Sequence, residues 1–88
     1  MKIETLSKKL GGRVWKRHGL ERIYLRRGYT TKKMSTSTFV QWDDVEKEWT
    51  VKCKIVCPSQ PSAWIMAEEK KVIDQVKKEI KQICESQE

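Results

Sequence analysis

The 88-residue sequence is poor in several features that define large classes of protein. It has no long apolar run, so no membrane-spanning segment is expected, and Met1 to Glu4 begin no apolar stretch of signal-peptide length. It also lacks phosphate-binding glycine loops and the short motifs of serine hydrolases and zinc proteases. We therefore expect a cytoplasmic protein that is not an enzyme.

Histidine and cysteine are scarce: there is one His and there are three Cys. An odd number of cysteines suits reduced thiols in an intracellular protein. Cys53 and Cys57 are four residues apart in an expected strand, about 13 Å at strand rise and too far for a shared metal or a disulfide. Zinc needs four ligands, and His18 is distant in sequence from Cys84 and the other two. We expect no metal and no cofactor, with the cysteines acting as small core residues.

Apolar residues are nevertheless plentiful enough for a folded core. They make up 38% of the sequence, and there are four Trp, which is unlike a disordered tail. A chain of this length supports one hydrophobic core and hardly a second. We therefore expect a single domain over residues 1–88.

Positive charge is concentrated in the first third of the chain. The formal net charge is +7, but residues 2–33 contain eleven bases against Glu4 and Glu21, a net charge of +9, and the remainder is at −2. All five Arg lie between Arg13 and Arg27. Arginine makes planar, multi-donor contacts to phosphate and stacks on rings. This clustering favours a surface that binds a polyanion or an acidic protein, although a merely solvated basic face is the simpler alternative.

The N-terminal half predicts a short helix followed by a hairpin. Ile3, Leu6 and Leu10 have helical spacing within residues 2–10, and Gly11-Gly12 would end that helix. Two alternating runs within residues 13–27 flank His18-Gly19, a pattern typical of a β-hairpin. Residues 29–33 are polar and are expected to form a loop.

The C-terminal half predicts a second hairpin and a long helix. Residues 34–42 and 49–57 read as strands, and the second alternates cleanly between apolar and polar side chains. Pro58 and Pro61 precede an apolar helical stripe that runs from about residue 62 to about residue 84. The expected fold is α+β in two layers: a four-stranded antiparallel sheet of two hairpins, with the short N-terminal and long C-terminal helices on one face.

The loop length of the first hairpin decides which side chains the open face of this sheet carries. With a two- or four-residue loop, two aromatic residues and four Arg share one face, and Val14, Ile23 and Leu25 share the other. The first set is Arg13, Trp15, Arg17, Arg22, Tyr24 and Arg26. With a three-residue loop, Trp15 joins the core and Lys16 takes its place outside. Tyr24 lies on the wet face in both registers.

Aromatic rings interleaved with Arg suit nucleic acid, because rings stack on unpaired bases and guanidinium groups bind phosphates. We expect a small binding domain that contacts nucleic acid through this hairpin, with RNA or single strands favoured over duplex DNA. Arg27, Lys32 and Lys33 could add phosphate contacts, and Lys52 and Lys54 could extend the basic face. The candidate residues are Arg13, Trp15, Arg17, Arg22, Tyr24, Arg26, Arg27, Lys32 and Lys33.

Two alternatives share this surface. One is a regulator or inhibitor that docks on an acidic protein or a nucleic-acid-handling enzyme, and the other is a homodimer formed through the open face or an edge strand. The element order loosely resembles that of double-stranded-RNA-binding domains. Those domains have three strands and a Lys-rich start to the second helix, which Lys70-Lys71 alone does not match, so no family is assigned.

Overall fold

The computed structural model describes residues 2–28 and 31–86, and its first element is the short helix α1 (Ile3–Leu10). Ile3, Leu6 and Leu10 are buried on one side of this helix, as the helical spacing predicted. Gly11 ends it in the left-handed conformation, with φ of 73°, and its N–H donates to the carbonyl of Lys8. The predicted glycine stop is confirmed.

Gly12 lies where the chain passes close over a strand. A Cβ built at this position would come within 2.5 Å of Ile23 Cγ2 and 2.9 Å of the backbone carbonyl oxygen of Tyr24. No real Cβ fits there, so glycine is required by the close approach of the backbone. This contact holds α1 directly against the strand that contains Ile23.

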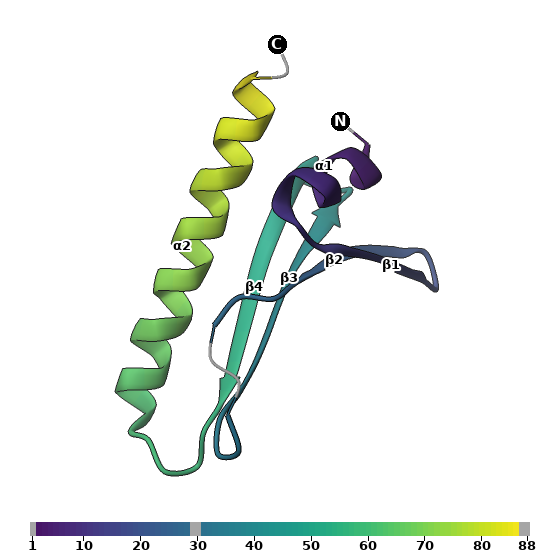
Figure 1. Cartoon of the computed structure of the whole chain (residues 1–88). Coiled ribbons are helices and arrows are strands. Elements are labelled where there is room, and N and C mark those ends of the chain that lie inside the picture. Colours follow the sequence, from purple (N-terminus) through teal and green to yellow (C-terminus); the bar gives the residue numbers. More distant parts are fainter. Residues whose placement is uncertain (1, 29–30, 87–88) are drawn as a thin grey trace.

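Four strands form one antiparallel sheet in sequence order: β1 (Arg13–Arg17), β2 (Leu20–Leu25), β3 (Ser35–Asp43) and β4 (Glu48–Val56). The strands β3 and β4 are the longest, at nine residues each, and run beside the long helix. The hairpin of β1 and β2 projects away from that helix (Figure 1). The predicted sheet of two hairpins is confirmed.

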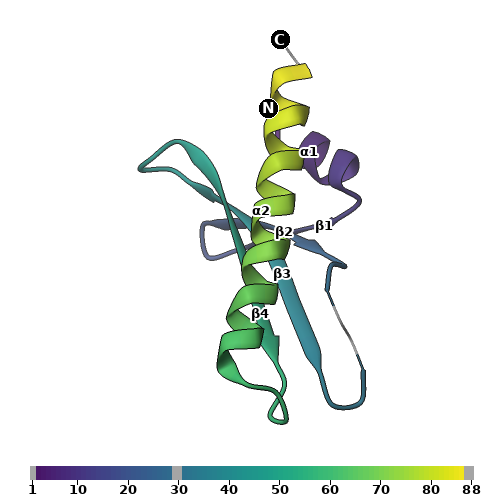
Figure 2. The ribbon, with the colours of Figure 1, turned by 90° about the vertical axis from the view of Figure 1, so that its left-hand side faces the viewer.

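The helix α2 (Ser62–Ser86) packs along β4, and α1 covers β1 and β2 on the same side of the sheet. Figure 2 shows α2 in front of the sheet with α1 beside it. One hydrophobic core joins both helices to the sheet; its central side chains include Leu6, Ile23, Val40 and Val76, each at most 1% exposed. The predicted two-layer α+β fold is therefore confirmed, and the described elements leave the other face of the sheet without a helix.

Strand register places two Trp at one end of the helix side. Val40 pairs with Val51 and Trp42 pairs with Trp49, so all four side chains share a face. The rings of Trp42 and Trp49 meet edge to face with centroids 5.0 Å apart. They close one end of the core layer.

The β4 edge of the sheet is covered by a side chain of α2. The backbone N–H of Ile55 donates to Glu69 Oε2 at 3.1 Å, which pairs an edge group that would otherwise be open.

Of the loop expected over residues 29–33, Tyr29 and Thr30 lie outside the described residues. Across the described ranges, neither helix has a stretch apolar and long enough to cross a bilayer.

Candidate functional site

The first hairpin has a two-residue loop, which settles which side chains face away from the helices. Arg17 pairs with Leu20 across His18-Gly19, and both loop residues have positive φ, 51° and 77°, the signature of a type I′ turn. Trp15 therefore lies opposite Arg22 on the uncovered side. The register in which Trp15 is part of the core is excluded.

Three aromatic side chains form a continuous row on this open face. Trp15 meets Tyr24 edge to face with ring centroids 6.1 Å apart, and Tyr24 meets Phe39 with centroids 5.4 Å apart. The row crosses from β1 through β2 to β3, because Phe39 pairs with Tyr24 in the sheet. We call Trp15, Tyr24 and Phe39 the aromatic platform. All three rings are half-buried, so part of each reaches the surface.

Arg22 lies at the centre of the platform and is held there by four contacts. Its guanidinium carbon is 5.1 Å from the ring centroid of Trp15 and 4.5 Å from that of Phe39, both within the range of cation–π attraction. Its Nε donates to Gln41 Oε1 at 2.9 Å, and one terminal nitrogen donates to the Tyr24 hydroxyl at 3.1 Å. Together, the two hydrogen bonds and the two cation–π contacts fix the aromatic rings and the Gln41 amide relative to one another.

Exposed cations surround the platform. Arg17 lies 6.0 Å from the ring centroid of Trp15, and Lys52 and Lys54 of β4 are paired with Phe39 and Ser37 of β3 on the same face. Arg13 pairs with Tyr24, and Arg26 continues the alternation one residue beyond β2. We call this set the cationic rim: Arg13, Arg17, Arg26, Lys52 and Lys54, all exposed.

Not every candidate residue lies on this face. Arg27 has the opposite parity to Arg26, and its guanidinium forms an ion pair of 2.7 Å with Glu79 of α2 on the helix side. Lys32 and Lys33 are exposed in the connection that precedes β3, where Lys33 N–H donates to Thr31 Oγ1. The structure thus brings together Arg13, Trp15, Arg17, Arg22, Tyr24 and Arg26, and leaves these three outside the platform and the rim.

Phe39 and Gln41 were missing from the sequence-based candidates. The sequence contains a signal for them, because Val40 and Trp42 are large apolar residues that suit a core, and strict alternation then turns Phe39 and Gln41 outward. Their contact with Arg22 could not be read locally, since it depends on how β3 pairs with β2 across a connection of nine residues.

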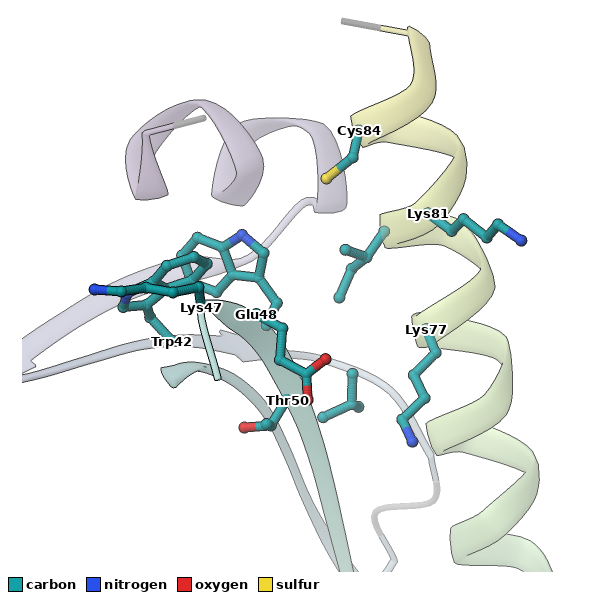
Figure 3. A pocket seen from close by; sticks show the side chains of 10 residues that line it. Trp42, Lys47, Glu48, Thr50, Lys77, Lys81 and Cys84 are labelled. Carbon is teal, nitrogen blue, oxygen red and sulfur yellow. The ribbon is translucent and has the colours of Figure 1, made fainter. Parts of the chain in front are cut away.

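The helix side has its own pocket, of about 630 Å³, between the Trp42–Trp49 pair and α2. Its apolar lining includes Val51 and Ile80. Figure 3 shows Cys84 pointing its sulfur toward this space and Lys81 pointing away from it. Its charged lining consists of Glu48 and three lysines, Lys47, Lys77 and Lys81, and is therefore mainly positive.

Few ionisable groups are perturbed. Burial raises the pKa of the Cys53 thiol, although a hydrogen bond from Thr38 partly offsets this, so Cys53 stays protonated at neutral pH. On the helix side of the sheet, a 2.9 Å hydrogen bond between Lys16 and Glu4 raises the pKa of Lys16 and lowers that of Glu4. Within residues 2–28 and 31–86, no three His, Cys, Asp or Glu side chains gather as metal ligands would.

No protein-family model, no curated protein and no solved structure matches this chain.

Proposed function

We propose that this protein is a small, non-enzymatic domain that binds single-stranded nucleic acid, or the unpaired bases of a folded RNA, on the open face of its sheet. The observation that carries the proposal is the aromatic platform with the cationic rim around it, on the side of the sheet away from both helices. Its side chains are rings, guanidinium groups, an amide and ammonium groups, which bind by stacking and by hydrogen bonding.

Stacking favours unpaired bases over a duplex. Each base laid on an aromatic ring contributes roughly 1–3 kcal/mol, and bases already stacked inside a double helix cannot use the platform. Trp15 and Phe39, both half-buried, lie at the two ends of a row that crosses three strands. Such a row can accept two or three consecutive bases.

The cationic rim would contact the phosphates that connect those bases. Five exposed cations lie around the rings, and an extended single strand crossing the platform passes several of them. With four phosphate contacts, the logarithm of the binding constant should fall with the logarithm of salt concentration with a slope of about −3. Reduced cysteines and a nucleic-acid ligand both suit the cytoplasmic location expected from the sequence.

The direct test is fluorescence anisotropy with labelled RNA and DNA oligonucleotides over a series of salt concentrations. We expect single strands to bind more tightly than a duplex of the same length. Absence of binding to any single strand at about 50 mM salt would overturn the proposal. Capture of an acidic protein through the same arginines, with nucleic acid removed, would then support the protein-docking alternative.

A sharper test removes two positive charges from the open face in one variant and two from α2 in another. Arg13→Ala with Arg17→Ala removes two rim cations and should make the salt slope about 1.4 less steep, since each phosphate contact on a single strand contributes about 0.7. The control is Lys70→Ala with Lys78→Ala, which removes the same charge from exposed positions of α2. Equal effects of the two pairs would mean that only net charge matters, contrary to a site on the open face.

A further inference from the structure

The side-chain amide of Gln41 has a fixed orientation. A guanidinium group carries only donors, so the atom of Gln41 that lies 2.9 Å from Arg22 Nε must be the carbonyl oxygen. The NH2 group is therefore on the other side of the amide. Gln41 is half-buried on β3, next to β2 and β4, which holds its backbone rigidly.

The polar groups of Tyr24 and Arg22 beside this amide also have hydrogens to donate. The Tyr24 hydroxyl oxygen accepts from Arg22 at 3.1 Å, which leaves its own hydrogen to be donated elsewhere. Arg22 has further N–H groups. We call Arg22, Tyr24 and Gln41 the donor cluster. The Thr50 hydroxyl, beside Gln41, differs. Its one hydrogen is donated to the Gln41 backbone carbonyl at 3.1 Å, so toward a ligand its oxygen can only accept.

This arrangement disfavours the usual way in which glutamine reads adenine. A glutamine with both amide atoms available pairs with adenine by accepting from N6 and donating to N7. Here Arg22 already takes one of the two lone pairs of the accepting oxygen, so the groups that Arg22, Tyr24 and Gln41 offer to a ligand are mostly donors. Guanine presents two adjacent acceptors, O6 and N7, on the same edge, and adenine presents a donor where guanine has O6.

Given the proposed function, on which this step rests, we infer that the platform selects guanine over adenine. A purine held beside Trp15 or Phe39 is close to the donor cluster, because the Arg22 guanidinium lies over both rings. Guanine O6 and N7 then receive hydrogen bonds from the cluster, whereas the adenine amino group would face a donor and leave both unpaired. The ligand is single-stranded nucleic acid with exposed guanines.

The test compares two RNA probes of about 15 nucleotides, a length that covers one site of this kind, with repeated UUG in one and repeated UUA in the other. Isolated purines keep the probes unstructured, and both carry the same number of phosphates. We expect the guanine probe to bind about tenfold more tightly to the unaltered protein, within the range of one bidentate base contact.

The variant Gln41→Glu turns the outward donor into an acceptor while Arg22 keeps its partner. The tenfold preference should then disappear or reverse toward adenine, and the added negative charge cancels in the ratio of the two affinities. Gln75→Glu, an exposed position on α2, adds the same charge and should leave the preference unchanged.

The outcomes separate this inference from the proposed function. Tight binding of both probes with affinities within about twofold would mean that the donors contact phosphate, and would overturn the guanine preference alone. A preference that survives Gln41→Glu would also overturn it. Binding of neither probe would overturn the proposed function and the guanine preference together.

Discussion

Arg22 has three contacts with the aromatic platform and one with Gln41, and this changes its expected role. The sequence presented it as one of several phosphate ligands, but its guanidinium lies between two rings and donates to Gln41 and Tyr24. A group so engaged orders the surrounding side chains more than it attracts a backbone phosphate. Within the proposed site Arg22 therefore positions the rings and the Gln41 amide, in addition to the N–H groups that it offers to a base.

Arg22→Lys keeps the charge and removes the planar, multi-donor group. We expect the free energy of unfolding to fall by about 1–2 kcal/mol and the affinity for single strands to fall about tenfold, because the rings and the amide lose their common partner. The salt slope should hardly change, since the formal charge is the same. Chemical denaturation and anisotropy measure these quantities.

The matched control is Arg17→Lys, at an exposed rim position where a point charge is sufficient. It should preserve both stability and affinity. Full affinity in Arg22→Lys would contradict the positioning role and make Arg22 an ordinary charge contact.

At the scale of elements, periodicity predicted nearly all of the secondary structure. The alternation over residues 49–57 became β4 (Glu48–Val56), and the apolar stripe over residues 62–84 became α2 (Ser62–Ser86). Periodicity could not decide the register of the first hairpin, because loops of two and three residues fit the same alternating pattern. The positive φ of His18 and Gly19 decides it.

The junction between α1 and β2 gives an element-scale prediction. Gly12→Ala places a methyl group against Ile23 and the Tyr24 carbonyl oxygen, so we expect a loss of about 2 kcal/mol in the free energy of unfolding. For a domain of this size the melting temperature should drop by about 10 °C, as followed by circular dichroism.

Gly11→Asn provides the comparison for that substitution. Gly11 has positive φ but no atoms within 4 Å of a built Cβ, and asparagine tolerates the left-handed conformation. We expect it to cost less than about 1 kcal/mol. Equal losses at the two positions would show that the close approach at Gly12 adds no cost of its own, contrary to this prediction.

Across the whole molecule, the positively charged side chains of the N-terminal third are divided between the two faces of the sheet. Lys16 lies on the helix side with Glu4, and Arg27 is paired with Glu79. The sequence places Glu79 fifty-two positions after Arg27, so no local pattern could reveal that pair. The open face instead gains Lys52 and Lys54 from β4, in the part of the chain that is negative overall.

The separation of the four indole rings has an optical consequence. Trp15 is in the platform, Trp42 and Trp49 lie at the helix-side pocket, and Trp64 is near the start of α2. A base stacked on the platform should quench the emission of Trp15 and leave that of the others almost unchanged. With Trp42, Trp49 and Trp64 replaced by Phe, the remaining fluorescence would report occupancy of the face without an attached dye; a signal that does not respond to saturating RNA would place the bound bases elsewhere.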